Sequence, residues 1–173
     1  MICPIVYDEF LSTVFDELNR KKFEYYIGCL LLKVPEFLPK YMILYGSPGC
    51  GKSTTLKCVT EIFEHFYLPY NFVNYDTDFG SLPALRSDVG LADDAGVNRF
   101  IKHVESYDPP VNMRFILCTN KLPTINDEDC MIVQFTGRRF SKEDYQLIYR
   151  GLLEFTPEFG KYCMDRTFEI VEA

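Results

Sequence analysis

The stretch YMILYGSPGCGKSTTLKCVTEIFEHF, residues 41–66, decides the fold of this chain. It opens with five apolar or aromatic residues, 41–45, a length and composition typical of a buried parallel strand. A glycine-rich segment follows at 46–53. From Lys52 onward the apolar residues recur at helical spacing, at Leu56, Val59, Ile62, Phe63 and Phe66. The stretch therefore predicts a strand, a glycine loop and an amphipathic helix in direct succession.

The glycine loop matches the phosphate-binding pattern GxxxxGK(S/T). In such a loop the glycines let backbone N–H groups wrap the phosphates, and the N-terminus of the next helix adds a favourable dipole. Lys52 is expected to neutralise the β- and γ-phosphate oxygens, and the Ser53 hydroxyl to bind Mg²⁺. We predict that ATP or GTP binds here, held by Gly46, Ser47, Pro48, Gly49, Cys50, Gly51, Lys52, Ser53 and Thr54.

Strands and helices alternate outward from the loop. Further strands are predicted at 70–75, 89–92, 113–118 and 131–135, and helices at 97–104 and 141–154, the last capped by Ser141. An amphipathic helix at 7–22 and an apolar segment at 25–32 come before the first strand. This alternation predicts an α/β fold, and with the glycine loop it predicts a P-loop NTPase whose parallel sheet is covered by helices on both faces. We expect a helical lead-in at 1–40 packed on a P-loop ATPase core with a C-terminal helix at 41–173.

Acidic and amide side chains follow two of these strands. Asp93 and Asp94 come at a strand end, where a nucleotide hydrolase needs one carboxylate for Mg²⁺ and a base for water. We assign Asp93 to the metal and Asp94 to water activation, with an acidic turn as the alternative. Asn120 ends another strand, where it could hold the attacking water or the γ-phosphate, or form an Asx turn.

Composition and charge exclude several classes of protein. The chain has 173 residues, 47% of them hydrophobic, which suits one domain with a sizeable core. Its net charge of -7 argues against coating nucleic acid by bulk positive charge, so any such site must be local. The apolar runs fall far short of the roughly 20 residues that span a bilayer. We find no secretory signal and expect an intracellular protein, in the cytosol or a host nucleus, whose seven cysteines are reduced and mostly fill the core.

Four segments together resemble the superfamily-3 helicases of DNA viruses, phages and plasmids. They are GSPGCGKST, FGSLPALRSDVGLADDA, NRFIKHVES and FILCTNKLPTINDED, and the resemblance covers roughly residues 8–150. It implies an AAA+-like ATPase core that uses ATP and Mg²⁺. By position, Lys52 and Ser53 would contact phosphate and metal, Asp93 and Asp94 would form the acidic pair, and Asn120 would be the polar sensor.

The same resemblance implies partners. Members of the family act as homo-oligomeric rings, often hexamers, on nucleic acid during replication of a virus or mobile element. We therefore expect single-stranded DNA, or alternatively RNA, as the polymer. Under this interpretation the basic residues near a narrow pore would be Lys102, His103, Arg114 and Lys121.

Two features depart from the family. Only 25 residues separate Asp94 from Asn120, where members place a longer element with a DNA-contacting hairpin, so we expect that hairpin to be reduced or missing. The stretch that should carry an arginine finger, 127–130, is Asp-Glu-Asp-Cys. Arg138 and Arg139 are the nearest substitutes as finger or sensor. Surface charge or a phosphate clamp is the alternative role for both.

Two other functions stay open at this point. A small P-loop kinase for a nucleoside, nucleotide or sugar would suit the chain length, with Arg138, Arg139 and Arg150 as lid arginines. Such kinases do not require a polar sensor like Asn120. A weakly catalytic nucleotide switch or loader is a third alternative, motivated by the absent finger position and the shortened hairpin.

Overall fold

A five-stranded parallel sheet forms the centre of the molecule, in the strand order β2-β3-β4-β1-β5. The computed structural model describes residues 2–73, 87–93, 96–124 and 127–172. Along the chain the elements are α1 (Ile5–Val14), α2 (Glu17–Leu31), η1 (Pro35–Phe37), β1 (Tyr41–Tyr45), α3 (Lys52–His65), β2 (Tyr70–Phe72), β3 (Val89–Ala92), α4 (Val97–Val104), β4 (Arg114–Thr119), η3 (Asp127–Asp129), β5 (Cys130–Gln134), α5 (Lys142–Glu154) and α6 (Thr156–Glu172).

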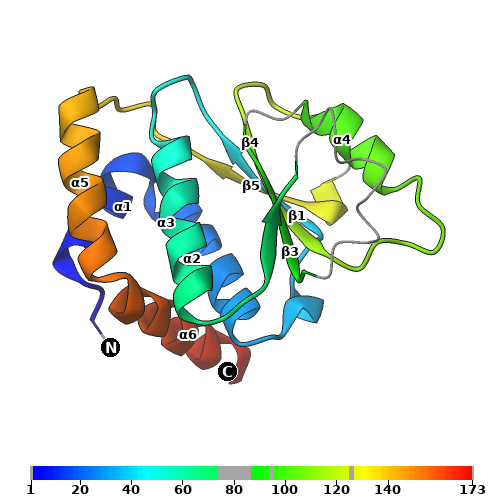
Figure 1. Cartoon of the computed structure of the whole chain (residues 1–173), viewed down its shortest axis with the longest axis horizontal. Helices are drawn as coiled ribbons and strands as arrows, with labels where there is room; N and C mark the ends of the chain where they lie inside the picture. The colour runs from blue at the N-terminus through cyan, green and yellow to red at the C-terminus, as the bar shows by residue number, and fades with distance from the viewer. Residues whose placement is uncertain (1, 74–86, 94–95, 125–126, 173) are drawn as a thin grey trace.

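Side chains of the central strands alternate between two hydrophobic cores. In β1, Met42 and Leu44 enter one core while Tyr41 and Ile43 enter the other, and all four are fully buried. The first core includes residues of α1, α2, α3 and α6, and the second includes α4. Figure 1 shows the sheet between these two groups of helices. The predicted α/β phosphate-loop fold, with helices on both faces of a parallel sheet, is confirmed.

The N-terminal segment corrects the prediction of a single helix at 7–22. The chain leaves the helical path at Phe15 and Asp16, which divide α1 from α2. The Asp16 carboxylate accepts the backbone N–H of Asn19 at 2.8 Å and so caps α2. Because the apolar residues on both sides of the break keep helical spacing, the pattern alone does not reveal it.

The C-terminal half holds a confirmed helix and an unpredicted one. The cap of α5 is as predicted, because the Ser141 hydroxyl accepts the backbone N–H of Asp144 at 3.1 Å. The last helix predicted from the sequence ends at 154, so α6 is an additional helix. That helix packs closely on α2, and the ring of Phe159 stacks on Tyr7 of α1 with centroids 4.1 Å apart. Of the strand predicted at 70–75, β2 forms the part Tyr70–Phe72, and residues 74–75 lie outside the described part of the chain.

Two further observations bear on the expected class of protein. Five of the seven cysteines are buried, as expected for residues that fill the core. Within the described parts of the chain, no helix has both the length and the apolar character needed to cross a bilayer.

A buried carboxylate joins the N-terminal helices to α6. Glu24 of α2 is 3% exposed, and its Oε2 lies 3.4 Å from Nε of Arg20. Burial raises the pKa of Glu24, although Arg20 and Arg166 act in the opposite direction. A carboxyl whose folded pKa is raised stabilises the fold at low pH and loses that contribution as the pH rises through the folded pKa.

We therefore expect the wild type to lose stability relative to Glu24→Gln as the pH rises above the ordinary glutamate pKa of about 4.3, until it passes the raised folded pKa. Urea unfolding of both proteins at several pH values measures the two free energies of unfolding. The difference between them isolates Glu24, because all other titrating groups are common to both. A difference that stays constant would show that the two arginines balance burial, and one that moves in favour of the wild type as the pH rises would show that they outweigh it.

Candidate functional site

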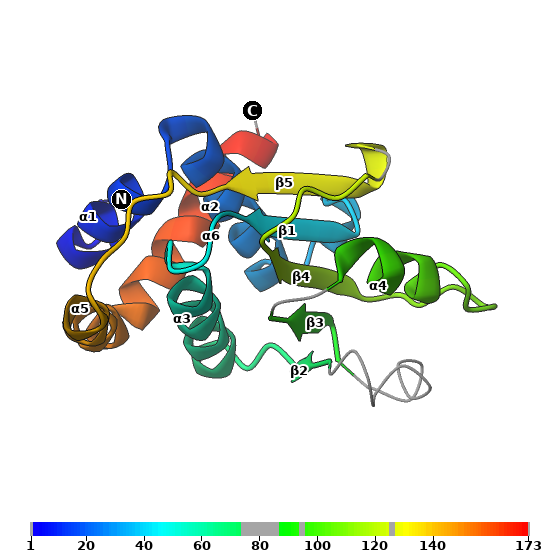
Figure 2. The ribbon, with the colours of Figure 1, turned by 90° about the horizontal axis from the view of Figure 1, so that it is seen from above.

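The carboxyl ends of the strands gather the predicted polar residues at one edge of the sheet. Because β4 lies between β1 and β3, Asn120 after β4 stands between the glycine loop after β1 and Asp93 after β3. Tyr45 pairs with Thr119 in the sheet register, and the N–H of Gly46 donates to the Thr119 carbonyl at 3.3 Å. Figure 2 shows the arrowheads of β3 and β5 directed to the same side, as the parallel pairing requires.

The glycine loop turns tightly at positions where a side chain is disfavoured. Gly49 and Gly51 have φ values of 78° and 107°, in the left-handed region. A Cβ atom added at Gly46 would lie 2.7 Å from Sγ of Cys50, which is buried beneath the loop. The Thr55 hydroxyl donates to the Gly51 carbonyl at 2.8 Å and fixes the first turn of α3. The loop is therefore held in a wrapped shape.

Lys52 is the first residue of α3 and is only 9% exposed. Its ammonium donates to the carbonyl oxygens of Gly46 at 2.7 Å and Ser47 at 2.9 Å, and it lies 3.6 Å from Sγ of Cys50. These bonds fix a positive charge inside the loop, at the N-terminus of a helix. Both the ammonium and the helix dipole favour an anion there.

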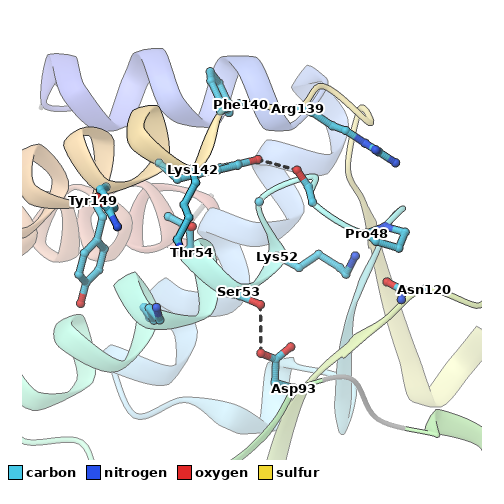
Figure 3. A pocket seen from close by; sticks show the side chains of 15 residues that line it. Pro48, Lys52, Ser53, Thr54, Asp93, Asn120, Arg139, Phe140, Lys142 and Tyr149 are labelled. Carbon is cyan, nitrogen blue, oxygen red and sulfur yellow. Dashed lines mark hydrogen bonds between the residues drawn. The ribbon is translucent and has the colours of Figure 1, made fainter.

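Ser53 and Asp93 meet across the cleft although they are 40 residues apart in the chain. The Ser53 hydroxyl donates to Oδ2 of Asp93 at 3.0 Å, and both residues are exposed (Figure 3). Hydroxyl and carboxylate oxygens are hard ligands of the kind Mg²⁺ takes together with nucleotide phosphates. The donor set therefore fits Mg²⁺. Asp94, predicted to activate water, lies outside the described residues.

Asn120 lines the same cleft and is exposed. The turn that carries it is fixed by its neighbours. Thr119 Oγ1 accepts the N–H of Lys121 and donates to the Lys121 carbonyl, both at 3.1 Å. Figure 3 shows Asn120 at the end of the cleft that also holds Pro48 of the glycine loop. The Asn120 amide is therefore placed to contact a ligand group that lies just beyond the glycine loop.

The two arginines proposed as finger or sensor occupy different positions. Both are exposed and follow a bend at Gly137, whose φ is 87°. Arg139 lines the cleft, with its Cδ 4.0 Å from where a side chain at Gly49 would begin. Arg138 is not a lining residue in the described part of the chain. The structure therefore separates two residues that the sequence could not distinguish.

The basic residues considered for a pore do not gather in one place. Lys102 and His103 lie on α4, whose core is on the sheet face away from α3, and His103 Nε2 is 3.2 Å from the Tyr107 hydroxyl. Arg114 begins β4, whereas Lys121 lies just beyond its other end. They therefore do not form one group on this chain.

One wall of the cleft comes from α5 and the residues before it, and of its side chains only Arg139 was predicted from the sequence. The cleft has a volume of about 680 Å³, within the usual range for small-molecule sites. On this side it is lined by Arg139, Phe140, Lys142, Tyr145, Gln146 and Tyr149. The positions 142, 145, 146 and 149 fall on one face of a helix by their spacing. This helical spacing could have indicated from the sequence that the four residues share a face. The sequence does not show which part of the protein that face contacts.

Tyr145 joins this wall to the glycine loop. Its hydroxyl donates to the Gly49 carbonyl at 2.9 Å. Burial raises the pKa of Tyr145 above its ordinary value, so the phenol keeps its proton at neutral pH and remains a donor. The wall therefore has a fixed position relative to the loop.

Comparison with known proteins supports the fold. No protein-family model matches this sequence, and no curated protein matches it. Three solved structures of the NrS-1 C-terminal region are similar. An A-form apo structure of residues 305–718 has a TM-score of 0.60 at 16% identity, covering 90% of this chain and 44% of that chain. A second A-form apo structure gives 0.61 and 17%, covering 94% and 45%.

The third, an apo structure of the same region, gives a TM-score of 0.59 and 16% identity, covering 96% of this chain and 52% of that chain. At this identity the likeness concerns the fold. The chain spans about half the length of the NrS-1 chains that it matches.

Proposed function

We propose that this chain is an ATP-hydrolysing motor domain of the superfamily-3 helicase type, which couples Mg-ATP hydrolysis to movement on nucleic acid. One observation carries the proposal: a lysine, a hydroxyl, a carboxylate and an amide from three strand ends line one cleft. They are Lys52, Ser53, Asp93 and Asn120. Phosphate-loop hydrolases need this combination to cradle phosphates, hold Mg²⁺ and position water.

Each residue has a role that follows from its place. Lys52 neutralises the β- and γ-phosphate oxygens from within the loop. Ser53 and Asp93 hold Mg²⁺, which supplies charge stabilisation to the phosphates when bound. Asn120 orients the attacking water or the γ-phosphate. Asp94 is assigned to water activation from the sequence alone.

The proposed assembly is a homo-oligomeric ring, such as a hexamer, acting on single-stranded DNA, with RNA as the alternative polymer. The family resemblance supports this. The two arginines then take different parts. Arg139, which lines its own cleft, acts as sensor or phosphate clamp, and exposed Arg138 is the residue available to a neighbouring subunit.

The test is the steady-state rate of ATP hydrolysis with Mg²⁺, titrated with single-stranded DNA at several protein concentrations. We expect DNA to raise the rate, and the rate per subunit to rise with protein concentration because the site is shared between subunits. The Lys52→Ala protein gives the contaminating background. A rate that ignores DNA would overturn the motor function. Phosphate transfer to a nucleoside or sugar would indicate a kinase, and tight binding with negligible turnover a switch.

Asp93→Asn is expected to lower the hydrolysis rate about 100-fold, equivalent to about 2.7 kcal/mol, because the amide replaces an anionic metal ligand. Nucleotide affinity in EDTA should stay within about 3-fold of the wild type, since Asp93 acts through the metal. Calorimetric titrations with and without Mg²⁺ measure the affinities. The matched control is Asp88→Asn, an exposed carboxylate just before the opposite end of β3. Equal losses in the two variants would contradict a metal role for Asp93.

A further inference from the structure

The cleft is longer than a phosphate site requires. Figure 3 shows Asn120 at one end and Tyr149 at the other, with Lys52 and Ser53 between them. Both ends belong to the same cavity of about 680 Å³. The end at Asn120 and Asp93 is polar and carries the proposed metal and water contacts. The other end is formed by α5 and the second turn of α3.

The position of the polar groups sets the direction in which a bound nucleotide must run. The γ-phosphate belongs at the Asp93 and Asn120 end, where metal and water are needed. The remainder of the molecule must then leave the loop past Thr54, the residue after Ser53, toward Lys57. Lys57 lies four residues, or about one helical turn, beyond Ser53 on α3. Both Thr54 and Lys57 line the cleft.

The surface that meets the molecule there is aromatic and amide-bearing. Tyr149 is half-buried, and one face of its ring is covered by the ammonium of Lys57, 5.9 Å from the ring centroid. Lys57 is exposed, so a flexible side chain rather than the packed core occupies that face. Gln146, one turn away on α5, is exposed to the cleft and offers a hydrogen-bond donor and an acceptor.

We propose that this end of the cleft is the nucleobase subsite: the base stacks on Tyr149, and Gln146 hydrogen-bonds to its polar edge. The inference rests on the proposed function, since it assumes that a nucleotide occupies the loop. Aromatic side chains stack on every base because every base has a π-face, and Gln146 can reverse its amide. The Tyr145–Gly49 hydrogen bond holds α5 at a set distance from the phosphates, so base and phosphates are bound together.

The experiment compares two ligands that share phosphates but differ in the base. Calorimetry with Mg²⁺ measures binding of ATP and of inorganic tripolyphosphate to the wild type, Tyr149→Leu, Tyr149→Phe and Lys52→Ala. We expect Tyr149→Leu to weaken ATP binding roughly 10-fold, within the range for base–aromatic stacking, and to leave tripolyphosphate unchanged. Tyr149→Phe should retain ATP affinity because the ring remains. Lys52→Ala should weaken both ligands.

The control is Tyr67→Leu, which removes a tyrosine that is 90% exposed and does not line the cleft. It should change neither affinity. Equal weakening of ATP and tripolyphosphate by Tyr149→Leu would assign Tyr149 a structural role and overturn the subsite, as would unchanged ATP affinity. A wild type that binds neither ligand would overturn the proposed function itself. Unchanged tripolyphosphate binding also shows that the variant is folded.

Discussion

Lys52→Ala is expected to weaken Mg-ATP binding roughly 100-fold and to reduce hydrolysis to background. Charge-assisted hydrogen bonds contribute about 1.5–3 kcal/mol each, and every 1.4 kcal/mol is tenfold in affinity. The ammonium is held inside the loop by the Gly46 and Ser47 carbonyls, so its charge is already in place when phosphates enter. Calorimetry and a coupled phosphate-release assay measure the two quantities.

Lys161→Ala is the matched control, because Lys161 is exposed on α6 and does not line the cleft. It should leave binding and hydrolysis unchanged. Because Lys52 also donates hydrogen bonds to carbonyls of its own loop, Lys52→Ala could destabilise the fold. Thermal unfolding of both variants tests whether the loss of binding comes from the missing phosphate contact or from unfolding. Hydrolysis that persists in a folded Lys52→Ala protein would rule out this cleft as the catalytic site.

Gly28→Ala is expected to destabilise the fold by about 3 kcal/mol, the upper part of the usual range for overpacking. A Cβ atom at Gly28 would lie 2.0 Å from Thr167 Oγ1 and 2.5 Å from the Cys163 carbonyl oxygen. The helices α2 and α6 cannot keep this approach with a methyl group between them. The better helix propensity of alanine, about 1 kcal/mol, offsets only part of the cost. We expect the melting temperature to fall by roughly 10 °C.

The control for Gly28 is another helical glycine. At Gly151 of α5 the nearest atom to an added Cβ is a side-chain methyl of Val6, at 3.1 Å, which can shift. Gly151→Ala should therefore be close to neutral. Adding Thr167→Ala to Gly28→Ala should recover part of the loss but not all of it, because the Cys163 carbonyl is backbone and stays in place. Full recovery, or a stable single variant, would show that α6 is not packed on α2 as described.

Comparing the predicted helices with the observed ones shows which features of the fold could be predicted from the sequence. The α5 boundaries and the Ser141 cap were predicted because a cap is a contact between near neighbours in the chain. The break at Phe15 and Asp16 was missed, since apolar spacing continues through it. The helix α6 was missed as well. Its position depends on α2, more than 120 residues earlier, and that contact leaves no local pattern.

Within the site, Arg138 and Arg139 also could not be distinguished from local sequence pattern. Arg138 and Arg139 are adjacent and chemically identical, so the sequence could propose both for one role but could not choose. Only the bend at Gly137 and the packing of the loop place Arg139 on the cleft and leave Arg138 off it. Asp94 keeps the role proposed from its position in the chain.

The sequence by itself determined the phosphate loop, the order of strands and helices, and the residues that follow the strands. These are local patterns, and the carboxyl ends of parallel strands share one edge, so Lys52, Ser53, Asp93 and Asn120 could be expected to meet. The tertiary structure alone decided the rest of the cleft. Tyr145 and Gly49 are 96 residues apart, and their hydrogen bond depends on how α5 packs against α1 and α3. Packing of distant segments therefore supplied the wall on which the base is proposed to bind.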